Sequence, residues 1–125
     1  MAPAASSTTW PTTVCSVPAY EPLCTVMHDP TLDPERLDTF GAFEAVQAIR
    51  SLGDLPMTII TAAHREDPAL APAELARLDA AWAEGVQRWG ALSPSATVVV
   101  IEDAGHHIEV DQPALVIDQV RNLLP

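Results

Sequence analysis

Basic residues are scarce in this chain. Its 125 residues include six Lys and Arg against 17 Asp and Glu, which gives a formal net charge of −11. Such a surplus of negative charge repels the phosphates of nucleic acids and the headgroups of anionic membranes. The composition therefore argues against nucleic acid or a membrane as a partner.

Long apolar runs are also missing. No stretch approaches the roughly 20 apolar residues of a membrane-spanning helix. The first residues, MAPAASSTTWPTT, have neither a basic start nor an apolar signal core. The length permits one small domain, and a hydrophobic content of 48% is enough to attempt a core. We expect a soluble, cytoplasmic protein.

The chain has only two cysteines, Cys15 and Cys24. They could form a bridge, but two cysteines in a proline-rich segment are a thin basis for a disulfide framework, and we favour free thiols. A nucleophilic role for Cys15 would need a nearby base and a positioned turn. Its surroundings, VCSVP, offer no glycine for such a turn, which argues against that role.

Residues 1–34 differ in composition from the rest of the chain. They contain six of the twelve prolines, three acidic residues and no basic residue. Prolines at this density prevent any long helix. One short extended piece could form from the apolar residues Val14, Val17, Leu23, Val26 and Met27. We therefore predict a loosely ordered N-terminal arm over residues 1–34 and a folded module over residues 35–125.

The remainder of the chain alternates between helical and strand-like patterns. Apolar spacings of three and four predict helices over 34–51 and 72–89, and an amphipathic helix begins at Pro113. Short apolar, β-rich runs predict buried strands at 57–62 and 97–101. This order favours an α/β fold with a small parallel sheet flanked by helices. Because two strands are normally too few to stand alone, we expect the arm or another chain to add a strand.

Residues 103–124, DAGHHIEVDQPALVIDQVRNLL, join the end of the second strand to a Gly-His turn, a proline and an amphipathic helix. Gly105 relaxes the backbone at the turn. His106 or His107 is thereby left near the crevice where open α/β sheets bind ligands. On the residues alone, a polar turn residue bonded to the backbone is the simpler interpretation of His106.

This stretch, together with the helix and strand order from about Phe40 onward, resembles the C-terminal portion of the α/β-hydrolase fold family. In that family a Gly-His turn after the last strand delivers the catalytic imidazole, and a Pro-led helix closes the domain. The resemblance implies that His106 is the base of a Ser-His-Asp mechanism that hydrolyses an ester or related bond. It implies Asp67, followed by Pro68, as the acid, with Glu66 as the alternate.

Two other interpretations of the acids stay open. Arg65 could neutralise either carboxylate, and acids at the start of a helix are favourable near the positive end of its dipole. The family's nucleophile sits in a Gly-x-Ser-x-Gly elbow, and no pair of the five glycines frames a serine in this way. The oxyanion loop is missing too. The resemblance thus implies a partial hydrolase, inactive alone, that takes a small-molecule substrate only when the missing N-terminal half is supplied.

The loops after the two predicted strands hold several side chains that could bind a metal: His64, Glu66, Asp67, His106 and His107. Their spacing matches no metal motif, so we expect neither metal nor cofactor. A function of a different class is a non-catalytic module that self-associates or binds a second polypeptide. Such a module would use its exposed strand edge and apolar helix faces.

Overall fold

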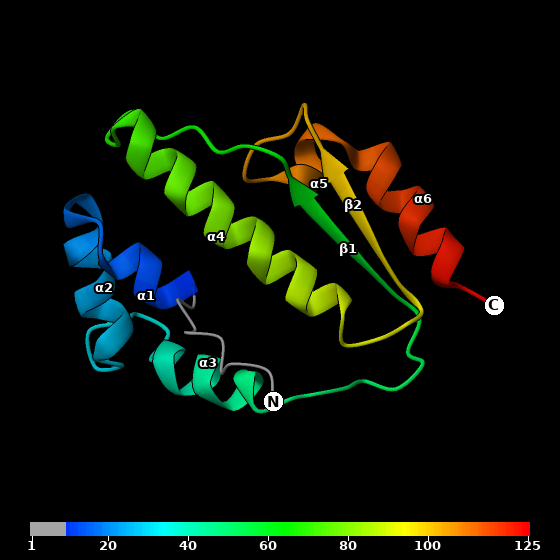
Figure 1. Cartoon of the computed structure of the whole chain (residues 1–125), viewed down its shortest axis with the longest axis horizontal. Helices are drawn as coiled ribbons and strands as arrows, with labels where there is room; N and C mark the ends of the chain where they lie inside the picture. The colour runs from blue at the N-terminus through cyan, green and yellow to red at the C-terminus, as the bar shows by residue number, and fades with distance from the viewer. Residues whose placement is uncertain (1–9) are drawn as a thin grey trace, which may run out of the picture.

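The computed structural model describes residues 10–125, which form a mixed α/β fold (Figure 1). Its elements, in chain order, are α1 (Trp10–Cys15), the 3-10 helix η1 (Pro18–Tyr20), α2 (Glu21–His28), α3 (Thr39–Gln47), β1 (Met57–Ala62), α4 (Pro72–Gly90), β2 (Ala96–Ile101), α5 (Ile108–Asp111) and α6 (Pro113–Leu123). Among these residues, no helix combines the length and apolarity needed to cross a membrane.

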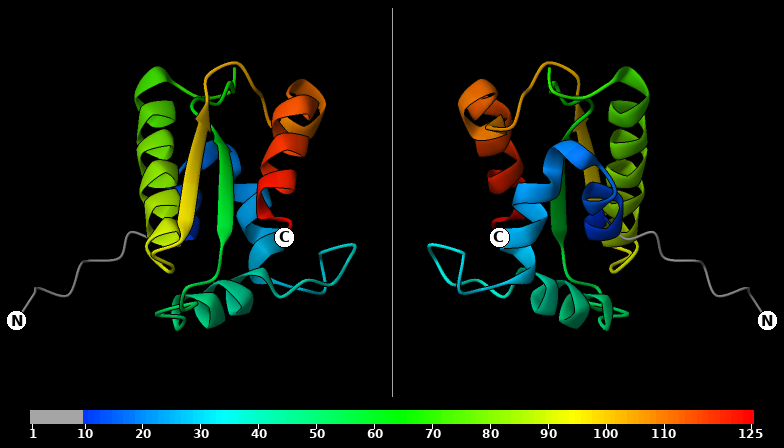
Figure 2. Two further views of the ribbon diagram at one scale, coloured as in Figure 1. Left: turned by 90° about the vertical axis from the view of Figure 1, so that its right-hand side faces the viewer. Right: turned by 90° about the vertical axis from the view of Figure 1, so that its left-hand side faces the viewer.

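The sheet consists of β1 and β2, which pair in parallel from Met57 opposite Ala96 to Ala62 opposite Ile101. The long helix α4 makes the crossover between them. Figure 2 shows α4 and α6 on opposite faces of the two strands. The predicted small parallel sheet flanked by helices is therefore confirmed, whereas a hydrolase-like layering remains a prediction.

The helix α4 starts where the sequence predicts and packs partly as expected. Pro72 begins the helix, and the Glu74 side chain accepts a hydrogen bond from the Ala71 N–H at 3.1 Å. Leu78 is fully buried at 0% exposure and Val86 is buried, but Trp82 and Trp89 are 41% and 44% exposed. Only part of the predicted apolar stripe thus faces the core, because a two-stranded sheet is too narrow to cover all of it.

The structure differs from the expected loosely ordered arm over the residues of that segment that it describes. Residues 10–28 form α1, η1 and α2, and residues expected in an extended piece are helical instead. The prolines explain this arrangement, since Pro18 and Pro22 stand in the first turns of η1 and α2, where a missing N–H costs nothing. The described part of the arm adds no strand, so the two-stranded sheet stays without a third.

The N-terminal helices supply much of the core. Buried residues from α1, α2 and their connection pack with one residue of the loop before α4 and one of α4 itself; they are Val14, Val17, Cys24, Leu70 and Leu78. Figure 2 (right) shows α1 and α2 on the β1 side, between α4 and α6. The described part of the segment that was expected to add a strand to the sheet therefore packs against α4 as short helices instead.

The cysteines form a disulfide, so the prediction of free thiols is wrong. Cys15 and Cys24 are joined by an S–S bond, with their Cα atoms 5.6 Å apart. The turn at Val17 and Pro18 reverses the chain, which brings the end of α1 against the face of α2. This Cα separation lies in the normal range for a disulfide. Chain reversal, rather than cysteine count, decided the pairing.

One helix is shorter than predicted, and one short helix was not predicted. The helix expected over 34–51 is the shorter α3, because Arg36 adopts a positive φ of 55° and Asp38 caps the helix by accepting a hydrogen bond from the Gly41 N–H at 2.9 Å. The short helix α5 was not predicted. It continues from the Gly-His turn, with Val110 N–H bonded to the His107 carbonyl at 2.9 Å.

Candidate functional site

The loops that follow β1 and β2 leave the sheet at the same edge, because the two strands are parallel (Figure 1). The strand pairing extends one residue further, with the Ala63 N–H donating to the Ile101 carbonyl at 2.8 Å. Beyond it, His64 Nε2 lies 3.2 Å from Glu102 Oε2. These contacts hold the two loops side by side. The loop after β1 carries the candidate residue Asp67, and the loop after β2 carries His106.

Asp67 is engaged by a residue from the N-terminal helices. Its Oδ2 accepts a hydrogen bond from the Tyr20 hydroxyl at 2.5 Å, and its Oδ1 accepts one from the Ala69 N–H at 2.9 Å. The Tyr20 bond, followed by the Ala69 bond and the positive charge of Arg65, holds the pKa of Asp67 below its ordinary value. The same bond, burial and the charge of Asp67 raise the pKa of Tyr20.

His106 is exposed in a turn that the following helices hold in place. The Gly105 N–H donates to Asp111 Oδ2 at 2.7 Å, and Gln112 Nε2 donates to the Asp103 carbonyl at 3.3 Å. The His106 ring meets the His107 ring edge to face, with centroids 4.9 Å apart. The turn thus presents both imidazoles to solvent.

Within the part of the chain that the structure describes, the contacts of His107 and of the two candidate acids do not include His106 paired with an acid. His107 Nδ1 lies 3.4 Å from Glu109 Oε1. Glu66 is exposed on the same loop as Asp67. Among residues 10–125, the hydrogen bonds of Asp67 reach Tyr20 and Ala69 and not His106. An Asp-His pair of the kind that the resemblance implies is therefore not assembled by these contacts, and its assignment stays a prediction.

Arg65 forms an ion pair with a carboxylate of α4. Its Nε lies 3.1 Å from Asp79 Oδ1, and its guanidinium sits over the Trp82 ring, 5.5 Å from the centroid. The Trp82 indole in turn donates to Thr61 Oγ1 at 2.8 Å. This chain of contacts holds the loop after β1 against α4. The charge of Arg65 also lowers the pKa of Asp67, but by less than the hydrogen bonds from Tyr20 and Ala69.

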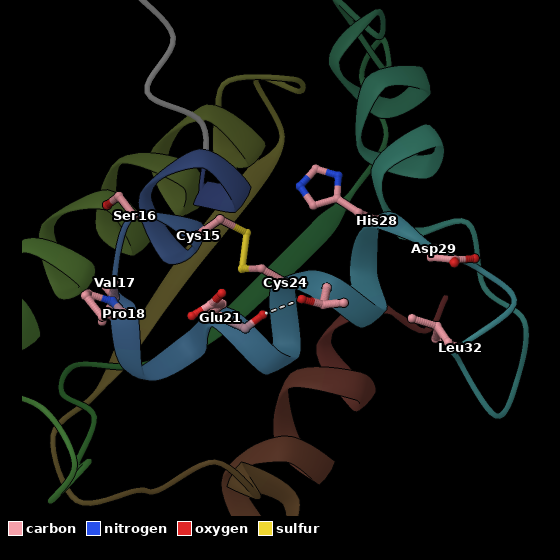
Figure 3. Close-up of a pocket in the computed structure, with 10 residues that line it drawn as sticks. Cys15, Ser16, Val17, Pro18, Glu21, Cys24, His28, Asp29 and Leu32 are labelled. Carbon is pink, nitrogen blue, oxygen red and sulfur yellow. Dashed lines mark hydrogen bonds between the residues drawn. A yellow bond between two sulfur atoms is a disulfide. The ribbon is translucent and has the colours of Figure 1, made fainter.

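A hollow lies at the N-terminal helices, far along the sequence from the Gly-His turn (Figure 3). It has a volume of about 760 Å³ and is lined by the disulfide and by Glu21, His28, Asp29 and Leu32. The His28 ring stacks on Phe40 with centroids 3.8 Å apart. No periodicity or motif in the sequence predicts this hollow, because the chain reversal between two short helices forms its walls.

The described residues, 10–125, contain no group of three or more His, Cys, Asp or Glu side chains placed to hold a metal ion. No protein-family model matches the chain, and no curated protein or solved structure matches it significantly. What the structure itself defines is a mixed α/β chain with a two-stranded parallel sheet. The α/β-hydrolase resemblance remains a prediction from the sequence.

Proposed function

We propose that this chain is the C-terminal part of an α/β-hydrolase-like unit, which hydrolyses an ester or related bond of a small molecule when a second polypeptide completes it. The observation that supports this most is the shared sheet edge: a loop with Asp67 follows β1, and a loop with His106, then a Pro-led helix, follows β2. Open α/β sheets bind ligands at this edge.

Each partner would contribute different chemistry. An exposed imidazole such as His106 can take a proton from a serine hydroxyl and return it to the leaving group. Asp67, whose pKa is lowered, supplies a carboxylate that orients the imidazole once it exchanges Tyr20 for His106. The completing polypeptide would bring the serine and the oxyanion donors. In the chain alone Asp67 is held by Tyr20, so the catalytic set is incomplete.

The test has two steps. The chain alone should hydrolyse a nitrophenyl ester no faster than its His106→Ala variant, since a histidine without a positioned nucleophile gives little rate. The DNA immediately upstream should then encode a Gly-x-Ser-x-Gly segment, and co-expression of that polypeptide should give esterase activity that His106→Ala abolishes. Turnover by the chain alone that depends on His106 would contradict the proposal, as would co-expressed activity that is indifferent to His106.

A second candidate function is a self-associating or protein-binding module, and the unpaired outer side of β2 favours it. Among residues 10–125, β2 has no strand on its outer side, and Val100 is 54% exposed. Apolar side chains of the C-terminal helix region are also exposed: Ile117, Val120, Leu123 and Leu124. Unpaired strand edges promote association. Light scattering should then give a mass above the monomer's 13.3 kDa, which Val100→Lys reduces; a strict monomer would exclude self-association.

A further inference from the structure

The disulfide forms part of the wall of the open hollow at the N-terminal helices. Both Cys15 and Cys24 line this space, and Figure 3 shows their bond between α1 and α2. The two sulfur-bearing residues differ in accessibility, because Cys15 is partly exposed and Cys24 is buried at 6% exposure. A disulfide bordering about 760 Å³ of open space is within reach of a small reactant.

We propose that this disulfide is a thiol-exchange site for a low-molecular-weight thiol that carries no negatively charged group besides the reacting sulfur. The thiolate of the small molecule attacks Cys15 Sγ, and the electron pair of the broken S–S bond leaves on Cys24 Sγ as a thiolate. One S–S bond breaks and one forms, so the step needs no further oxidant or reductant. The product is a mixed disulfide on Cys15 and a thiolate at Cys24, which takes up a proton from water to become the free thiol. This inference is independent of the proposed hydrolysis.

Accessibility fixes which sulfur is attacked. The incoming thiolate must approach along the line of the S–S bond from outside, so the more exposed sulfur is the electrophile. Cys24 belongs to the buried cluster with Val17 and Leu78, which closes the approach to it from the core side. Attack at Cys15 therefore makes the Cys24 sulfur the leaving group, and that sulfur stays buried in the protein.

Charge selects the class of thiol. The hollow is bordered by the carboxylates of Glu21 and Asp29, and the chain as a whole has a formal charge of −11. Hydrogen bonds from Thr31 keep the pKa of Asp29 low, so its carboxylate stays ionised at neutral pH. An anionic thiol is repelled at such a rim and a cationic one is attracted. The site thus favours aminothiols over mercapto acids.

The test uses the full oxidised chain with cysteamine, mercaptoethanol or mercaptopropionate, followed by rapid alkylation and peptide mapping by mass spectrometry. The mixed disulfide is expected on Cys15, with Cys24 alkylated. Rates are divided by those of the same thiols with hydroxyethyl disulfide, which removes their intrinsic differences. The normalised rate for cysteamine should exceed that for mercaptopropionate by about tenfold at low salt, and salt should shrink the ratio.

Matched single-cysteine variants give a second readout. Cys24→Ala leaves the thiol of Cys15, and Cys15→Ala leaves that of Cys24. With cystamine, the Cys15 thiol should form the mixed disulfide about tenfold faster than the buried Cys24 thiol. Exchange only in denaturant, a mixed disulfide mainly on Cys24, or normalised rates that ignore charge would overturn the proposal. If a variant does not fold, the mapping of the unmodified chain decides by itself.

Discussion

At the scale of single residues, the hydrogen bond between Tyr20 and Asp67 links segments 47 residues apart. It favours the ionised carboxyl and the neutral phenol together, which lowers the pKa of Asp67 and raises that of Tyr20. Asp67 is the acid that the hydrolase resemblance implies, so the N-terminal helices hold the residue on which the proposed chemistry depends.

Replacing that carboxylate should release the phenol. In Asp67→Asn the acceptor loses its charge, so we expect the pKa of Tyr20 to fall toward the ordinary value of 10.0. Tyr20 is the only tyrosine, so phenolate absorbance in the ultraviolet reports it alone. Asp29→Asn is the matched control, because Asp29 bonds Thr31 instead. A titration identical in Asp67→Asn and the unmodified chain would contradict the assignment.

The same bond should make stability depend on pH at both ends of the range. Asp67 has a folded pKa below 3.8, so its contribution is complete above pH 3.8 and is lost as the pH falls through the folded value. Tyr20 has a folded pKa above 10.0, so its contribution is complete below pH 10.0 and is lost as the pH rises through the folded value. In urea unfolding, the loss of stability caused by Tyr20→Phe should therefore be largest between pH 3.8 and pH 10.0. A difference that does not change with pH would contradict this.

At the scale of elements, α4 is the centre of the packing. It contacts α1 on one side and both strands on the other, and Leu78 is its fully buried residue. We expect Leu78→Ala to lower the free energy of unfolding by about 3 kcal/mol, because it leaves a cavity in the core. Leu32→Ala, at a position that is 53% exposed, is the control and should change it by about 0.5 kcal/mol or less. Urea unfolding measures both, and equal losses would show that α4 is not the core.

The short helix α3 depends on Asp38, the residue that caps its start. The Asp38 side chain accepts from the Gly41 N–H, which satisfies one of the free donors at the helix start. Asp38→Ala should destabilise α3 by about 1 kcal/mol. Hydrogen exchange should accelerate for the amides of residues 42–47, whereas Glu44→Ala, exposed on the same helix, should leave them protected. Unchanged protection in Asp38→Ala would disprove the capping role.

Most elements after residue 56 could be predicted from the sequence, because their signals are local. The strand predicted at 57–62 matches β1, the one at 97–101 matches β2 to within a residue, and the helix at 72–89 matches α4. Side-chain period and β-branched content act within a few residues. The helix at 34–51 was predicted too long, because a positive φ at Arg36 and a cap at Asp38 break a pattern that apolar spacing alone suggests.

At the scale of the whole molecule, the core is small and the disulfide contributes to it directly. Cys24 packs among Val14, Val17, Leu70 and Leu78, and the bridge closes a loop with a sequence separation of nine. We expect the double variant Cys15→Ala, Cys24→Ala to lose about 2–3 kcal/mol of stability, since the unfolded chain regains the freedom of that loop. Chemical unfolding with and without a reductant measures it. The double variant has no disulfide, so a reductant should not change its stability. A further loss of stability on adding reductant would show that the effect of the reductant is not reduction of this bond.

Local sequence patterns are enough to predict the mixed α/β order, the parallel strands and the position of His64, Asp67 and His106 on loops at the carboxyl ends of the strands, because each follows from local periodicity and strand direction. The Cys15–Cys24 bridge and the Tyr20–Asp67 bond form only in the folded chain. Both depend on a chain reversal at Pro18 and on helices packing against α4. Contacts between segments distant in sequence are fixed by burial of the whole chain, and no local pattern encodes them.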